Sequence, residues 1–365
     1  MATSIGRNSG STATPTKATF SYWLKGKEDG TAQGIWGWHR GNDASNYWLG
    51  VYYSTNGSMY INWKQGSFTL TLGTSQKFRD PTAWGHHVIS IDTTLSTAAD
   101  RIKWYVNGER ITSFEDGLDT ITQNSTILNW SNSNDKIEIG TWYQASTAKN
   151  LNNHLLSHFH FTDGYAYQAS DFGSTDSVTG QWKINTSPSV TYGNEGFFML
   201  KDDAALTDRS GNGNNFSLDG GTLTKTEDCP SNVFSTLNPL DKWVTSTLAT
   251  SSVLSNGNNT FHTASDGDKA ITRSTLGMSK GKYYCEVKIP QIERTWLGIC
   301  NKNIFDSATN NFWTTNLESG FFWYGNGTAI YNANSQTTGN YGGYANNDIV
   351  MMALDMDNYA WYLGK

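Results

Sequence analysis

Hydrophobic and polar residues alternate along most of this chain with the period of two that is typical of β-strands. Thr19–Gly26 (TFSYWLKG), for example, places Phe, Tyr and Leu on one face and Ser and Trp on the other. Asn-Gly pairs at 56–57, 107–108 and 326–327 separate such segments, and both residue types tolerate the positive φ angles of tight hairpins. Helical periodicity is nearly absent, and only 167–172 is expected to form a helical turn. The pattern predicts an all-β protein.

The density of these segments divides the chain into three parts. Residues 1–170 carry closely spaced strand patterns, which suit a two-sheet sandwich. Residues 171–245 alternate less and are rich in turn formers, but they retain Trp182 and Phe216, whereas a flexible linker would lack large aromatic residues. Residues 246–365 return to strand patterns. We therefore expect a sandwich domain, an ordered connector packed on it and a second sandwich domain.

Composition and charge exclude several classes of function. The 365 residues carry a formal net charge of −6, so no surplus of positive charge exists to coat a nucleic-acid backbone. No apolar run approaches the roughly 20 residues of a membrane-spanning helix, and residues 1–15 contain no apolar segment of a secretory signal. We expect neither nucleic-acid binding nor membrane insertion. Cys285 and Cys300 lie in strand-like segments and are expected to be buried.

Four segments of the first part follow one another in a familiar order. They are Trp84–Asp92 (WGHHVISID), Ile102–Ile111 (IKWYVNGERI), Lys136–Trp142 (KIEIGTW) and His158–Gly173 (HFHFTDGYAYQASDFG). This order resembles the laminin-G-like family, with Gly85 between the Trp and the His pair as a small departure. The resemblance implies a concanavalin-A-like jelly-roll sandwich.

Segments of the connector carry a second resemblance. They are Thr179–Ile184 (TGQWKI), Tyr192–Leu200 (YGNEGFFML), Asp208–Phe216 (DRSGNGNNF) and Cys229–Leu240 (CPSNVFSTLNPL). In order they resemble a string in structural and appendage proteins of marine bacteriophages, of the cyanophage type, which joins a laminin-G-like domain to a SPRY-like β-sandwich. The segments GKYYCEVKI, TWLGIC and DIVMMALDMDNYAWYLGK resemble SPRY strands. Because SPRY domains normally continue with a further hairpin, we expect this domain to be truncated at Lys365.

The resemblance implies a virion protein, placed on the tail or the capsid surface. The expected role is that of a tail-fibre or surface-appendage adhesin that contacts host-surface polysaccharide. The expected partners are other virion proteins and further copies of the chain, for example in a trimer. Release of particles by host lysis would explain the lack of a secretory signal. The alternative is a capsid fibre, decoration or spacer protein without a ligand, and a polysaccharide depolymerase is a third hypothesis.

Aromatic residues supply the clearest binding signal, because nine aromatic or imidazole side chains lie within residues 36–63. Sugar C–H faces stack on aromatic rings, and neighbouring Asn and Asp side chains bind the hydroxyl groups. The candidates for glycan binding are Trp36, Trp38, His39, Asn42, Asp43 and Trp48. The competing interpretation is that these rings form the core of the sandwich, where aromatic residues contribute most of the buried area. Strand parity places Trp36 and Trp38 on one face.

Candidates for catalysis and metal binding are sparse. Asp355 with Asp357, and Glu115 with Asp119, have spacings that let two carboxylates share a strand face, but both pairs fall in turn-like sequence. We therefore expect no enzymatic activity. Calcium is the one cofactor that the sequence suggests, because laminin-G-like domains often bind Ca²⁺ in rim loops through oxygen ligands. Asp43 and Asp163 are the candidate ligands.

Overall fold

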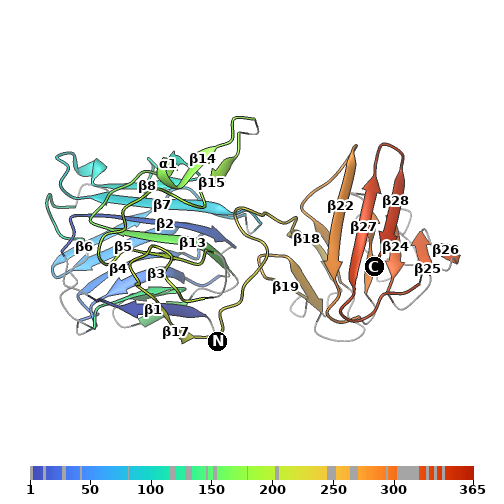
Figure 1. The fold of residues 1–365 in the computed structure, drawn as a ribbon, viewed down its shortest axis with the longest axis horizontal. Helices are drawn as coiled ribbons and strands as arrows, with labels where there is room; N and C mark the ends of the chain where they lie inside the picture. Colours follow the sequence, from blue (N-terminus) through green and yellow to red (C-terminus); the bar gives the residue numbers. More distant parts are fainter. Residues whose placement is uncertain are drawn as a thin grey trace. The chain divides into compact units, whose positions relative to one another are not determined.

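The computed structural model is all-β, as the alternation pattern predicts, and it divides into two compact units (Figure 1). The first unit comprises Met1–Phe234 with Ser255–Gly257, and the second comprises Ser235–Leu254 with Asn258–Lys365. The structure describes residues 3–10, 14–26, 30–41, 43–80, 82–115, 121–127, 134–144, 147–150, 154–178, 180–201, 205–244, 252–263, 270–292, 295–301, 320–325, 329–332, 335–338 and 342–365. Within these residues, no helix has the length and apolar character needed to cross a bilayer.

Two antiparallel sheets form the first unit. The larger has the order β17 (Ser217–Gly220), β1 (Ser4–Asn8), β10 (Lys136–Ile139), β3 (Gln33–His39), β4 (Tyr47–Tyr53), β5 (Met59–Gln65), β6 (Phe68–Gly73). The smaller has the order β16 (Phe197–Met199), β13 (Leu155–Asp163), β2 (Lys17–Lys25), β7 (Gly85–Asp92), β8 (Ile102–Val106), β9 (Glu109–Arg110). The segment expected to be a connector supplies β16 and β17, one strand to each sheet.

Short elements lie outside these two sheets. They are the hairpins β11 (Thr141–Gln144) with β12 (Thr147–Asn150) and β14 (Gly173–Thr175) with β15 (Trp182–Ile184), the 3-10 helix η1 (Ala98–Asp100) and the helix α1 (Ala169–Phe172). The helical turn expected at 167–172 is confirmed by α1.

The core of the first unit lies between the inner faces of the two sheets. Phe20 of the smaller sheet stacks on Trp36 of the larger one, with ring centroids 4.0 Å apart, and on Phe161 at 4.8 Å. Phe, Tyr and Leu of β2 point into this core, whereas Trp23 lies on the other face against His86. The alternation in the sequence therefore gives the correct face for each residue of β2.

Buried charged groups attach residues 190–234 to the sandwich. Arg7 Nη1 donates to Glu195 Oε2 over 2.8 Å, and the Lys25 ammonium pairs with Asp228. The Trp84 indole also donates to Asp228. A buried charge is costly unless it is paired, so these ion pairs stabilise the position of residues 190–234 on the sandwich.

The described residues of the second unit form four small sheets. Their orders are β18 (Leu237–Val244) with β21 (Ala270–Ser274); β19 (Ser252–Ser255) with β20 (Thr260–Thr263); β22 (Lys282–Lys288), β27 (Ile349–Asp355), β28 (Ala360–Gly364); and β23 (Trp296–Cys300), β24 (Gly320–Tyr324), β25 (Ala329–Asn332), β26 (Ser335–Thr338). Its buried cluster is Ile289, Trp323, Tyr344 and Val350. A SPRY-like arrangement of these strands remains a prediction.

The cysteines correct one expectation. Cys285 and Cys300 are free and exposed, so the prediction that they are buried is wrong. Both lie on strands at the edge of their sheets, β22 and β23, where fewer neighbours cover a side chain. Strand-like sequence identifies the strand but does not tell whether it is central or at an edge.

Candidate functional site

The tryptophans predicted to bind glycan lie inside the molecule. Trp36 and Trp38 share a face of β3, as parity predicts, and this face points into the core, where they are 1% and 2% exposed. Trp48 lies on the outer face of the same sheet but is only 5% exposed, with the Lys64 ammonium 5.0 Å from the centre of its ring. The competing interpretation therefore describes these three rings: they are packing groups and do not form an exposed surface for a sugar.

The other predicted residues lie at the β3–β4 end of the larger sheet. His39 is half-buried, with Nε2 3.3 Å from Glu138 Oε2. Asp43 is half-buried in the loop that follows, where its Oδ1 accepts a hydrogen bond of 3.0 Å from Asn46 Nδ2. Asn42 lies outside the described residues. Their assignment to glycan binding stays a prediction.

Asp163, the second calcium candidate, lies at the end of β13 in the smaller sheet. It is 7% exposed, and its Oδ2 accepts a hydrogen bond of 3.2 Å from the Glu195 backbone N–H. Burial raises the pKa of this carboxyl above its usual value, and the nearby Glu195 carboxylate adds to that effect. Over the part of the chain that is described, no group of three or more His, Cys, Asp or Glu side chains is arranged to hold a metal ion. Calcium binding remains a prediction.

A row of stacked rings crosses the outer face of the larger sheet. Trp142, from the hairpin β11–β12, is fully buried and lies parallel to Tyr52 with ring centroids 4.6 Å apart. Tyr52 in turn stacks on Tyr60 at 5.3 Å, and these two residues pair directly across β4 and β5. Space for the indole comes from Gly37 and Gly50, which face each other across β3 and β4. The row passes from a buried ring to two half-buried ones.

Polar groups gather at the half-buried end of this row. The Tyr60 hydroxyl donates to Glu115 Oε2, and Lys77 Nζ donates to Glu115 Oε1 over 2.7 Å. Ser58 also donates to this carboxylate, over 3.3 Å. The hydrogen bonds from Lys77 and then from Tyr60 lower the pKa of Glu115, so it is ionised at neutral pH. We call Tyr52, Ser58, Tyr60, Lys77 and Glu115 the Tyr60 patch.

The Tyr60 patch was only half visible in the sequence. Both tyrosines belong to the aromatic cluster at 36–63, but the sequence suggests Glu115 only as a partner of Asp119, which lies outside the described residues. A backbone hydrogen bond from the Glu115 N–H to the Gly73 carbonyl brings it to this edge of the sheet. No local signal marks such a long-range contact.

Neither Glu138 nor Asp355 has the raised pKa that the general acid of a glycosidase requires. Glu138 and Asp219 both contact the Lys136 ammonium, at 3.2 and 3.0 Å. Burial opposes ionisation of Glu138, but His39 and Lys136 outweigh it and lower the pKa. A glycosidase needs one carboxyl with a raised pKa as general acid. In the second unit, the hydrogen bond from Lys282 lowers the pKa of Asp355 to about 2, which also leaves an ionised group.

Ser21 and His86 are hydrogen-bonded to each other, but the direction of this bond does not suit catalysis. The Trp182 indole, which can only donate, gives a hydrogen bond of 2.9 Å to His86 Nδ1. The neutral ring therefore carries its proton on Nε2 and donates it to Ser21 Oγ, 2.9 Å away. A nucleophilic serine must instead donate its own proton to the histidine nitrogen. Burial lowers the pKa of His86 to about 3, which keeps the ring neutral.

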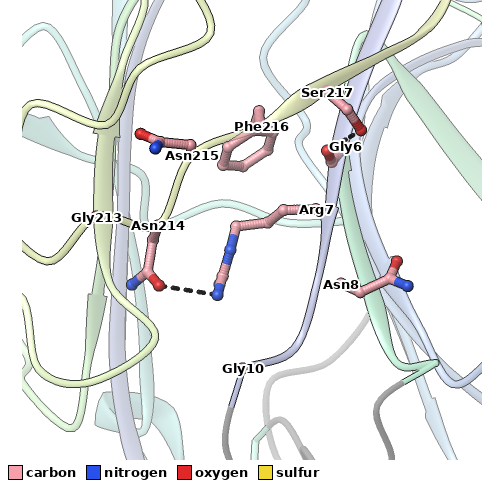
Figure 2. A pocket seen from close by; sticks show the side chains of 9 residues that line it. All are labelled: Gly6, Arg7, Asn8, Gly10, Gly213, Asn214, Asn215, Phe216 and Ser217. Atoms are coloured by element: carbon pink, nitrogen blue, oxygen red, sulfur yellow. Dashed lines mark hydrogen bonds between the residues drawn. The ribbon is translucent and has the colours of Figure 1, made fainter.

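A pocket of about 430 Å³ opens beside β1 (Figure 2). Its lining residues are Gly6, Arg7, Asn8, Gly10, Gly213, Asn214, Asn215, Phe216 and Ser217. Arg7 points across it and donates from Nη2 to Asn214 Oδ1 over 2.9 Å, as Figure 2 shows. Since the same guanidinium is paired with Glu195, its charge is already compensated. The polar contacts of this pocket fasten residues 213–217 to β1, and we assign it no ligand.

Comparisons with known proteins identify no family. No protein-family model matches the chain, and no curated protein is significantly similar to it. Among solved structures, a heptameric SAP-like pentraxin from Limulus polyphemus is 11% identical, covering 46% of this chain and 71% of its own, with a TM-score of 0.31. A Ruminococcus gnavus sialidase CBM40 bound to α2,3-sialyllactose is 13% identical over 43% of this chain and 80% of its own, with a TM-score of 0.32. Tailspike protein 2 of the Escherichia coli O157:H7 bacteriophage CAB120 is 14% identical over 46% of this chain and 22% of its own, with a TM-score of 0.32. Similarities of this size assign no function to the chain.

Proposed function

We propose that the chain is a structural protein of a virion surface appendage, of the tail-fibre type, that contacts glycans on the host surface. The ordered resemblance to appendage proteins of marine phages supports the location, with a laminin-G-like domain followed by a SPRY-like one. The observation that carries the glycan contact is the Tyr60 patch, where two half-buried rings adjoin an ionised carboxylate and an ammonium on rigid strands.

The Tyr60 patch has the chemistry that a sugar requires. The C–H face of a pyranose ring packs against a tyrosine ring, while Glu115 accepts and Lys77 donates hydrogen bonds to hydroxyl groups. One such contact is weak. Several copies in a homo-oligomer, for example a trimer assembled with other virion proteins, would raise the apparent affinity by multivalency.

Glycan binding by the full chain tests this role. We expect Tyr60→Ala and Glu115→Gln to weaken binding to a host-surface polysaccharide at least tenfold, the equivalent of about 1.4 kcal/mol. Tyr165→Ala is the matched control, because Tyr165 is an exposed tyrosine of the same unit outside the Tyr60 patch. Equal losses in all three variants, or none, would contradict the role of the Tyr60 patch. Immunogold labelling of purified particles tests the location: label at tail or fibre tips is expected, and unlabelled particles would exclude a virion protein.

A spacer or decoration protein without a ligand is the second candidate. It is favoured by the burial of all eight described tryptophans among residues 1–170, and by Trp142, which covers the centre of the outer sheet face. Immunogold label on the particle, together with no glycan binding by an oligomeric preparation of the chain, would establish a spacer or decoration protein. We propose no enzymatic activity in either case; Glu115, Glu138 and Asp355 have lowered pKa values, which do not suit a general acid.

A further inference from the structure

Two exposed tyrosines stand on the same face of the three-stranded sheet β22–β27–β28 in the second unit. Tyr284 of β22 pairs in register with Ala353 of β27, and Ala353 pairs with Tyr362 of β28. Side chains directly opposite in register lie on the same face, so the three form one row. Tyr284 is 59% exposed and Tyr362 is 60% exposed, whereas the opposite face of the sheet carries the residues of the buried cluster.

The row has the shape of a shallow cradle. Tyr284 and Tyr362 stand two strand spacings apart, roughly 10 Å, and only the methyl group of Ala353 lies between them. In the adjacent row, Gly364 adds no side chain beside Met351. A flat, narrow ligand can therefore reach the floor of the sheet between the two rings.

Polar groups border the cradle and balance each other in charge. The Tyr284 hydroxyl donates to Glu286 Oε1 over 2.7 Å, which fixes one ring beside a carboxylate. Lys282 and Asp355 pair across β22 and β27 in the row on the far side of Tyr284 from Glu286, and Lys282 Nζ donates to Asp355 Oδ2 over 2.6 Å. With Lys288, the face carries two positive and two negative side chains. This balance suits a neutral ligand rich in hydroxyl groups and disfavours a polyanion.

The size of the face separates a glycan from a protein partner. Three strands about 4.8 Å apart and five residues long cover roughly 240 Å². A stable protein interface buries about 800 Å² on each side. The face by itself is smaller than such an interface, and it fits two or three sugar rings.

We propose that the β22–β27–β28 face is a second glycan-binding site, in which a neutral oligosaccharide lies across the strands and packs against Tyr284 and Tyr362. Tyrosine combines a large flat ring with a polar hydroxyl, so it supplies both contacts that a pyranose needs. The site is independent of the Tyr60 patch and of the location of the chain on a particle.

Binding of the full chain to a panel of neutral hexaoses tests the proposal. The probes are cello-, laminari-, malto- and manno-hexaose, measured by isothermal titration calorimetry. We expect at least one hexaose to bind, and Tyr284→Ala and Tyr362→Ala each to weaken it at least tenfold. Tyr359→Ala is the matched control with no expected loss, because Tyr359 is 89% exposed in the β27–β28 turn, outside the row. Unchanged circular dichroism spectra of the variants would show that they are folded.

Several outcomes would overturn this site. They are the absence of binding to all four hexaoses and an equal loss of binding in Tyr359→Ala. Self-association that Tyr284→Ala and Tyr362→Ala abolish would identify the face as an interface between copies. Tyr60→Ala distinguishes the two sites: it should leave hexaose binding unchanged, and a loss caused by Tyr60→Ala alone would refute this site while supporting the Tyr60 patch.

Discussion

At the residue scale, glycines decide where the largest ring of the outer sheet face can lie. A Cβ atom added at Gly50 would come within 2.2 Å of Trp142 Cδ1 and 2.7 Å of the Trp36 carbonyl oxygen. We expect Gly50→Ala to destabilise the first unit by about 1–3 kcal/mol, the usual cost of overpacking. Gly10→Ala is the control, since its nearest neighbour would lie 3.6 Å away. Urea unfolding measures both, and equal midpoints would show that Trp142 does not depend on this space.

A second residue-scale prediction concerns the buried pair of Lys25 and Asp228. Asp228→Asn removes the negative charge and leaves a buried ammonium without compensation, at an expected cost of about 3–5 kcal/mol. Asp176→Asn breaks the exposed pair with Lys183 and should cost less than about 1 kcal/mol. Thermal unfolding of both variants provides the comparison. Similar melting temperatures would mean that residues 190–234 are not held by this charge.

At the element scale, β7 makes the first unit sensitive to acid. Burial lowers the pKa of His86 and His87 to about 3, whereas an unfolded histidine titrates near 6.5. The unfolded chain therefore binds more protons below pH 6.5, and stability falls as the pH drops from there toward 3. At pH 5 each ring should cost about 2 kcal/mol. Above pH 7 both rings are neutral in the folded and the unfolded chain, so they make stability independent of pH there.

Urea midpoints at pH 7.5, 6 and 5 would measure this slope. His87→Gln removes one titrating ring and should reduce the slope, even though it lowers stability at pH 7.5 because His87 stacks on Tyr22. His262→Gln is the control, because His262 lies in β20 of the second unit and not in the unit that contains β7. A slope that survives His87→Gln in full would assign the acid sensitivity to other groups.

The sequence predicts the strands and their faces well, but it does not predict which distant residues pack against them. Alternation gives the inner and outer faces of β2 and β3, because the side-chain period of a strand is fixed by its backbone. It does not tell that the outer position of Trp48 is only 5% exposed, since that depends on tertiary neighbours such as the Lys64 ammonium over its ring. The same limit explains the Tyr60 patch: Tyr60 is visible in the aromatic cluster, but Glu115 reaches it only through the tertiary fold.

At the scale of the whole molecule, two separate cores predict two unfolding transitions in calorimetry. Asp228→Asn should lower only the transition of the first unit. Trp323→Ala should lower only that of the second, because it empties the site of a ring that is 2% exposed and lies 5.0 Å from the Tyr344 ring. A single transition that both variants shift equally would show one cooperative unit. Independent transitions would allow the Tyr60 patch and the β22–β27–β28 face to be tested without each variant disturbing the other unit, because each core is stabilised by its own contacts.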